Sequence, residues 1–205
     1  MSELLVHLTA LFEAGHARPV DGLRTDRAFA DPGAATQAAV LIAVVDRPQP
    51  TMILTQRPNS MRDHPGQVAF PGGKLEAGED AVVAALREAN EELGIAADAV
   101  DIIGVSDLYH TGTGFAVTPV LGLVEPGIAI TPDAREVEAW FEAPLDLMFD
   151  PASWTERTAM WKGAERVYLD MRYEGFRIWG VTAAIIANLA RRLNYRAVQT
   201  HSRSP

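Results

Sequence analysis

The sequence has 205 residues, of which 48% are hydrophobic and 22% charged, as is usual for a globular domain with its own core. It contains no cysteine, which excludes disulfides, thiolate metal sites and cysteine nucleophiles and suits a reducing compartment. The formal net charge of −9 argues against non-specific binding to nucleic acid, which needs a basic surface. The apolar run 38–45 is too short to cross a bilayer, and no basic stretch precedes the N-terminal leucines. We therefore expect a cytoplasmic protein without a membrane span or secretory signal.

The hydrophobic pattern predicts a mixture of helices and strands within one domain, 1–205. Apolar residues at helical spacing predict an N-terminal helix over 2–14, followed by an irregular lead-in to residue 36. The core then occupies 37–195. Its expected elements are strands at 38–46 and 51–57, a helix at 79–93, strands at 101–109, 115–125 and 137–141, a hairpin of strands at 166–173 and 176–179, and a helix at 181–193. This mixture favours a single α/β layer architecture.

The helix predicted over 79–93 carries three carboxylates on one flank. At about 100° per residue, Glu88 and Glu92 lie about 40° apart, and Glu91 lies about 60° beyond Glu88. Like charges at these spacings oppose helix formation by about 0.2–0.5 kcal/mol per pair, which a divalent cation would offset. A solvated acidic face is the alternative interpretation. The residues predicted to form the buried stripe are Val82, Leu86, Ala89 and Leu93.

The neighbours of these carboxylates favour a metal site. Arg87 can hold a carboxylate through a bidentate pair, and Glu79 is expected to start the helix, where the helix dipole favours an anion. Gly72 and Gly73 allow the backbone to approach closely, so that a main-chain carbonyl can also reach a metal ion. Magnesium is commonly held by one or two carboxylates together with substrate phosphates.

These residues form a spaced pattern. Gly73 is followed after five residues by Glu79 and after seven more by the run Arg87-Glu88-Ala89-Asn90-Glu91-Glu92-Leu93-Gly94-Ile95. The pattern resembles the Nudix box at every charged and glycine position. The resemblance implies a three-layer α/β/α sandwich with a mixed sheet. It also implies metal-dependent hydrolysis of nucleoside diphosphates linked to another moiety.

The resemblance also assigns roles to the residues of the box. Glu88, Glu91 and Glu92 would bind Mg²⁺ or Mn²⁺, with the carbonyl of Gly73 as a further metal ligand. Arg87 would orient these acids, and Glu79 would support them. A carboxylate from a later loop often completes such a site; Glu136 is the better match, although a solvated pair of Glu136 and Glu138 is an equal alternative.

The segment before the box resembles the extra motif of the coenzyme A pyrophosphatase branch of Nudix hydrolases. The motif residues are Ile53-Leu54-Thr55-Gln56-Arg57-Pro58, Arg62, Gly66 and Phe70-Pro71-Gly72-Gly73. Pro58 departs from the pattern, because a small Ser or Ala is usual there. The segments 113–120 and 178–183 also look like this branch. The implied reaction cleaves coenzyme A into adenosine 3′,5′-bisphosphate and 4′-phosphopantetheine.

The implied substrate-binding residues are Arg57, Arg62, Gly66, Phe70 and Gly72. The two arginines would supply cations for phosphate groups, although exposed or structurally paired arginines are the alternative. The partner expected is thus a small nucleotide, with a homodimer left open. Two other functions remain at this point: a pyrophosphatase for another nucleoside diphosphate derivative such as ADP-ribose, and a non-catalytic nucleotide-binding module on the same fold.

Overall fold

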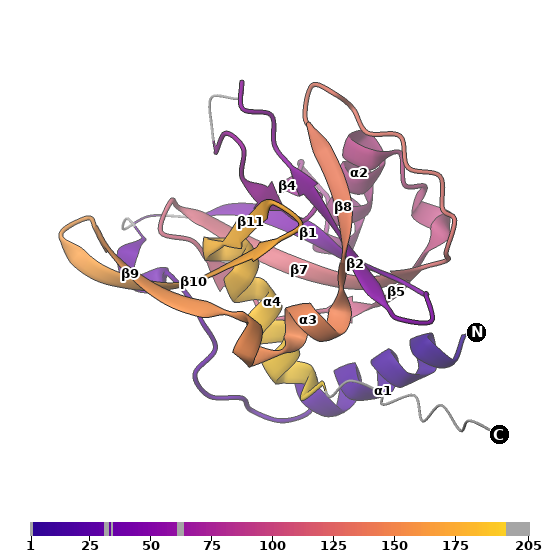
Figure 1. The fold of residues 1–205 in the computed structure, drawn as a ribbon, viewed down its shortest axis with the longest axis horizontal. Coiled ribbons are helices and arrows are strands. Elements are labelled where there is room, and N and C mark those ends of the chain that lie inside the picture. The colour runs from indigo at the N-terminus through magenta and orange to yellow at the C-terminus, as the bar shows by residue number, and fades with distance from the viewer. Residues whose placement is uncertain (1, 31–32, 34, 61–63, 196–205) are drawn as a thin grey trace.

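The computed structural model describes residues 2–30, 33, 35–60 and 64–195 (Figure 1). Its helices are α1 (Glu3–His16), α2 (Ala81–Leu93), α3 (Leu145–Phe149) and α4 (Gly180–Leu193), with short 3₁₀ turns η1 (Arg27–Phe29), η2 (Ala97–Ala99) and η3 (Pro151–Ser153). Its strands are β1 (Thr36–Val45), β2 (Thr51–Gln56), β3 (Val68–Ala69), β4 (Gly72–Lys74), β5 (Val100–Val105), β6 (Tyr109–His110), β7 (Phe115–Val124), β8 (Ala139–Pro144), β9 (Thr155–Trp161), β10 (Ala164–Tyr173) and β11 (Phe176–Trp179). None of the helices in this described part is both long and apolar enough to cross a membrane.

A mixed eight-stranded sheet forms the centre of the fold, with β3, β2, β1, β7 and β5 in that order. β1 and β7 are parallel over ten residues, from the pair Thr36 and Phe115 to the pair Val45 and Val124. β2 runs antiparallel to both β1 and β8, and the short strand β4 pairs antiparallel with β1. A separate antiparallel sheet contains β9, β10 and β11. The long, almost wholly apolar β1 and β7 fit central strands that are covered on both faces.

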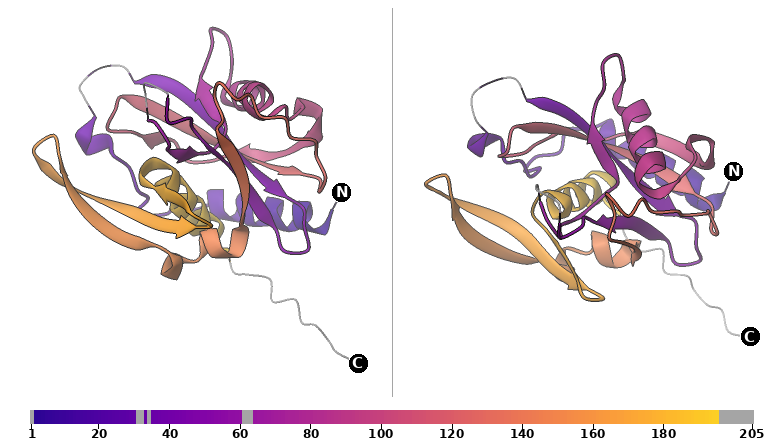
Figure 2. Two further views of the ribbon diagram at one scale, coloured as in Figure 1. Left: turned by 45° about the horizontal axis from the view of Figure 1, so that its top comes forward. Right: turned by 90° about the horizontal axis from the view of Figure 1, so that it is seen from above.

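Successive residues of β1 face two different layers, because side chains alternate across a strand. Leu41 and Ala43 pack in the cluster that contains the apolar face of α2. Ile42 and Val44 pack in the cluster formed with α1 and α4. Figure 2 shows these helices arranged about the sheet. The predicted α/β/α sandwich with a mixed sheet is confirmed.

The start of α2 differs from the prediction. The helix begins at Ala81, because the carboxylate of Asp80 caps it by accepting hydrogen bonds from the backbone N–H groups of Val82 and Val83, both at 2.9 Å. Glu79 therefore lies in the turn before the helix and not in its first turn. The helix ends at Leu93 as predicted, and Gly94 caps it in a left-handed conformation with φ of 69°.

The buried face of α2 agrees only in part with the predicted stripe: Ala89 and Leu93 are buried as predicted. Val82 and Leu86 are only partly buried, whereas Ala84 and Ala85 are fully buried beside Ala89. Small side chains let the helix approach β1 closely, so the alanines take the central positions of the interface. The helix α3 and the strands β3, β4 and β9 are absent from the prediction, and the strand predicted over 101–109 is divided into β5 and β6.

Candidate active site

Three carboxylates converge beside the carboxyl end of α2. One oxygen from each of Glu88, Glu92 and Glu136 lies within 4.8 Å of the other two. Glu92 is 5% exposed, Glu88 is partly buried and Glu136 is exposed. Spacing along one helix brings the first two together, as the sequence predicts for residues four apart.

Glu136 reaches this cluster because its loop is tied to the end of α2. The N–H of Thr131 donates to the carbonyl of Leu93 at 2.8 Å, and the N–H of Asp133 donates to the carbonyl of Glu92 at 2.9 Å. The N–H of Glu136 then donates to the carbonyl of Asp133 at 2.9 Å. These bonds satisfy the last carbonyls of the helix and fix the loop that carries Glu136.

The electrostatics of the cluster fit a bound divalent cation. Burial, together with the nearby carboxylates of Glu88 and Glu136, raises the pKa of Glu92 to about 8, although the Gly72 N–H and Arg57 act in the opposite direction. Burial also raises the pKa of Glu88. Crowded, poorly solvated acids of this kind favour either protons or a cation, and carboxylate oxygens are the ligands that Mg²⁺ and Mn²⁺ prefer. The donor set therefore fits the metal that the sequence pattern implies.

Arg87 holds the acids on one side of the cluster. Its Nε and Nη2 donate to the two carboxylate oxygens of Glu79 at 2.8 and 3.1 Å. Its Nη1 donates to Oε1 of Glu88 at 2.9 Å and to Oε2 of Glu91 at 3.0 Å. The bonds from Arg87 lower the pKa of Glu79. Glu79 thus positions the guanidinium, and the guanidinium orients Glu88.

Glu91 differs from the other two acids of the helix. Its side chain is 54% exposed and paired with Arg87, and it is not part of the group of three converging oxygens. Glu91 as a metal ligand therefore stays a prediction, and its carboxylate lies beside Arg87.

The two glycines before the helix let β4 pass between β1 and α2. A Cβ atom on Gly73 would lie 2.2 Å from Oε1 of Glu88, and one on Gly72 would lie 2.4 Å from the carbonyl oxygen of Ala39. The N–H of Gly72 donates to Oε1 of Glu92 at 3.4 Å. These contacts bring the main chain of β4 against Glu88 and Glu92. The sequence pattern predicts Gly73 beside these two acids.

A cavity of about 600 Å³ opens beside the acids. Glu92 and Glu136 line it, as do two cationic residues, Arg57 and Lys74. Within the part of the chain that the structure describes, the buried Nε of Arg57 has no hydrogen-bond partner. The apolar lining includes Phe70, Phe115, Val117, Val181 and Ile185. The cavity can therefore accept a molecule with an anionic part and an apolar part.

The other predicted substrate residues have mixed outcomes. Phe70 is 3% exposed and lines the cavity, as does Gly72. Gly66 does not line it; its φ of 66° and its N–H bond of 3.1 Å to the Arg57 carbonyl give it a role in the turn before β3. Arg62 lies outside the described residues.

Glu138, the other acid considered beside Glu136, is not part of the group of converging oxygens and pairs with Asn59. One of its carboxylate oxygens accepts hydrogen bonds from the backbone N–H and the Nδ2 of Asn59 at 3.0 and 3.2 Å. Lys74 is a cavity residue that sequence reasoning missed. Lys74 directly follows Gly73 in β4, and this position in the sequence could have indicated that it lies near the acids.

Comparison with known proteins places this arrangement in a family. The family model described as the NUDIX domain matches residues 35–167. The chain belongs to the Nudix family. Proteins named uncharacterized Nudix hydrolase NudL from Escherichia coli O7:K1 and Salmonella paratyphi B are 44% identical over 156 residues, which are 75% of this chain and 81% of theirs. A Nudix hydrolase structure from M. smegmatis, RenU, is 22% identical with a TM-score of 0.49, covering 62% of this chain and 81% of that one.

Membership of the Nudix family establishes the general chemistry. The protein is a Nudix pyrophosphohydrolase, an enzyme acting on small nucleotide derivatives that contain a pyrophosphate. Nudix hydrolases use divalent metal ions, and the cluster of Glu88, Glu92 and Glu136 supplies carboxylates suited to them. The alternative of a non-catalytic module is not supported, because the acids of the box are present and two of them, Glu88 and Glu92, converge with Glu136.

Proposed function

We propose that this Nudix hydrolase cleaves the pyrophosphate bond of coenzyme A or its derivatives. The products would be adenosine 3′,5′-bisphosphate and a 4′-phosphopantetheine portion. The proposal rests on the position of Arg57, a residue of the motif that precedes the box. It lines the cavity beside the acids, and its buried Nε lacks a partner among the described residues. A buried donor without a partner favours a ligand that supplies an acceptor.

The shape and charge of the cavity support the same substrate class. Coenzyme A carries a diphosphate and a ribose 3′-phosphate, so it needs cationic groups beyond a metal site. Arg57 and Lys74 offer them. The pantetheine arm needs a less polar surface, and the wall of Phe70, Phe115 and Val181 offers one.

The acids would hold Mg²⁺ or Mn²⁺ through Glu88 and Glu92, with Glu136 completing the group of oxygens and the carbonyl of Gly73 and Glu91 as further candidates. A divalent cation at such a site neutralises diphosphate charge and lowers the pKa of a bound water. Arg87, held by Glu79, donates to Oε1 of Glu88 and so fixes this acid beside Glu92 and Glu136. Arg57 and Lys74 would fix the substrate phosphates relative to these acids.

Product analysis with a substrate panel tests the proposal. The purified protein is incubated with Mg²⁺ or Mn²⁺ and either coenzyme A, dephospho-coenzyme A or ADP-ribose, and the products are identified by mass spectrometry. We expect kcat/KM for coenzyme A to exceed that for ADP-ribose by about tenfold or more, which corresponds to ~1.4 kcal/mol. Equal or faster turnover of ADP-ribose would assign the enzyme to another nucleotide. A Glu92→Gln variant, prepared in the same way, controls for contaminating hydrolases.

A further inference from the structure

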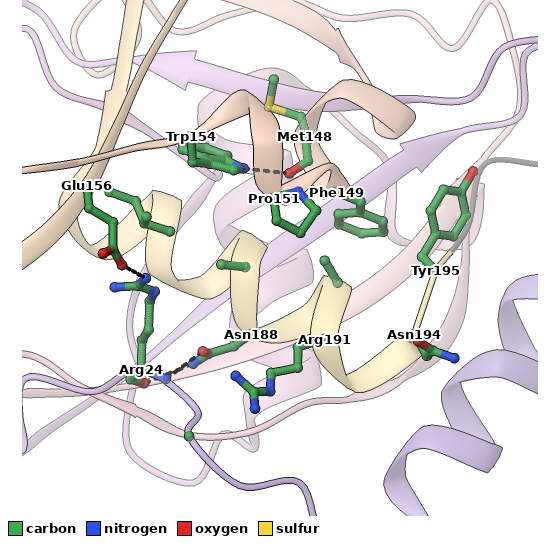
Figure 3. A pocket seen from close by; sticks show the side chains of 14 residues that line it. Arg24, Met148, Phe149, Pro151, Trp154, Glu156, Asn188, Arg191, Asn194 and Tyr195 are labelled. Carbon is green, nitrogen blue, oxygen red and sulfur yellow. Dashed lines mark hydrogen bonds and ion pairs between the residues drawn. The ribbon is translucent and has the colours of Figure 1, made fainter.

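A second cavity, of about 510 Å³, lies beside the carboxyl-terminal half of α4 (Figure 3). It shares no lining residue with the cavity at the acids. Thr182 and Ile185 of α4 border the catalytic cavity, whereas Ala187, Asn188 and Arg191 of the same helix border the second one. Its volume falls within the range of about 300–1,000 Å³ that is typical of small-molecule sites.

One wall of this second cavity is apolar and held rigidly. Met148 and Phe149 of α3 are buried, and the indole Nε1 of Trp154 donates to the carbonyl of Met148 at 3.0 Å. The rings of Phe149 and Tyr195 meet edge to face with centroids 5.1 Å apart. The hydroxyl of Tyr195 donates to Asp146 at 2.9 Å. The indole N–H of Trp154 and the hydroxyl of Tyr195 therefore already have hydrogen-bond partners, which leaves the aromatic and aliphatic surface of this wall for a ligand.

The opposite side of the second cavity carries charge. Asn188 fixes the backbone of Arg24, since its Oδ1 accepts from the Arg24 N–H at 2.7 Å and its Nδ2 donates to the Arg24 carbonyl at 2.9 Å. The Arg24 guanidinium is ion-paired with Glu156. In Figure 3 the labelled side chains of Arg24, Asn188 and Arg191 lie along the lower side of the view, and those of Trp154 and Phe149 lie along the upper side.

Arg191 supplies a cation that is not neutralised. Its guanidinium lies near Gly22, where a Cβ atom would be 3.4 Å from Nη1. No acidic residue among the described parts of the chain forms an ion pair or a side-chain hydrogen bond with it. Because Arg24 and Glu156 offset one another, the lining carries one net positive charge. A guanidinium fork matches a carboxylate in geometry.

We propose that this second cavity binds a small carboxylate with a single negative charge and an apolar body. The carboxylate pairs with Arg191, and the apolar body lies against Trp154, Phe149 and Met148. The net charge of the lining favours a monoanion, because a dianion would face the carboxylate of Glu156 with only one free guanidinium opposite.

Calorimetric titration with 1-naphthoate tests the proposal, with the uncharged 1-naphthalenemethanol as the matched compound. Arg191→Gln removes the charge and is expected to weaken naphthoate binding about fivefold while leaving the alcohol unaffected. Arg172→Gln is the control, because Arg172 is an exposed arginine on β10 that does not line this cavity. This control is expected to bind both compounds as the unmodified protein does.

A second variant locates the site by filling it. Ala187→Leu adds volume at a partly buried helix position that borders the second cavity, and leucine is a good helix former. We expect Ala187→Leu to weaken the binding of both compounds, while kcat and KM at the catalytic site stay unchanged. Ala190→Leu serves the same purpose if the first variant folds poorly. The proposal is overturned if naphthoate does not bind at millimolar concentration, or if neither Arg191→Gln nor the filled cavity alters its binding.

Discussion

Gly73 and Glu88 are in contact in a way that only glycine permits. A Cβ atom at position 73 would lie 2.2 Å from Oε1 of Glu88, well inside any tolerated contact. The carboxylate sits against the main chain of β4 and is held from its other side by Nη1 of Arg87 at 2.9 Å. The glycine therefore helps to set the position of an acid proposed to bind metal.

Gly73→Ala is expected to displace Glu88 and lower kcat by about 10²-fold, because misplacement of a catalytic group by about 1 Å has effects of this size. Steady-state kinetics at saturating Mn²⁺ measure the change, and circular dichroism checks the fold. Gly127→Ala is the control: nothing lies within 4 Å of a Cβ there, although its φ of 88° is strained for alanine. Full activity in Gly73→Ala would show that the position of Glu88 does not matter.

Arg87→Lys is expected to lower kcat by about 10–100-fold, as is typical when a residue that orients metal ligands is changed. Lysine keeps the charge but cannot reproduce the paired bonds to Glu79 together with those to Glu88 and Glu91. Arg47→Lys is the matched control, because Arg47 forms a comparable two-bond pair with Glu142 outside the cavity. Similar kinetics in the two variants would contradict the orienting role.

Lys74→Met is expected to raise KM for coenzyme A about fivefold to tenfold and change kcat less, since Lys74 would bind phosphate rather than the reacting acids. Nζ of Lys74 now lies 5.8 Å from the centre of the Phe115 ring in the cavity lining. Lys74→Arg should retain most of the affinity. A comparison with dephospho-coenzyme A shows whether the 3′-phosphate is the group involved. An unchanged KM in Lys74→Met would remove this residue from the substrate contacts.

The stability of the metal-free protein should depend on pH through Glu92. Its pKa is about 8 when folded, against an ordinary value of 4.5, so the folded state binds this proton more tightly. Proton binding by Glu92 therefore contributes to the stability of the folded state at low pH, and this contribution is lost as pH rises through about 8. In EDTA, Glu92→Gln should raise the free energy of unfolding by roughly 1–3 kcal/mol at pH 9 and by little at pH 5.

Urea titrations at both pH values measure this effect of Glu92. Glu125→Gln is the control, because Glu125 is an exposed carboxylate in the turn after β7. Its effect should be small and similar at the two pH values. Equal stability differences for Glu92→Gln at pH 5 and pH 9 would be inconsistent with the buried, crowded carboxyl group that the structure shows.

The acids of α2 could be predicted from sequence because their relation is local. Residues four apart on a helix share a face whatever the rest of the chain does, so Glu88 and Glu92 had to be neighbours. Glu136 is different. Its place beside them depends on hydrogen bonds from Thr131 and Asp133 to the end of α2, and no local pattern encodes such bonds. Only the resemblance to a known family pointed to it.

One of the elements that were missed, β9, lacks a local hydrophobic signal. β9 is exposed along most of its length and exists through its pairing with β10, where Thr155 lies opposite Asp170 and Trp161 opposite Ala164. The start of α2 was misplaced because Glu79 and Asp80 are both acidic. Only their hydrogen bonds distinguish the two residues. Asp80 caps the helix by accepting from the Val82 N–H, whereas Glu79 accepts from the Arg87 guanidinium.

The most direct test of the account is diffraction from crystals grown with Mn²⁺ and coenzyme A, measured at the manganese absorption edge. We predict anomalous density among Glu88, Glu92 and Glu136, next to the diphosphate of the bound nucleotide. Bound nucleotide with no anomalous density near these three carboxylates, or with manganese held elsewhere, would contradict it.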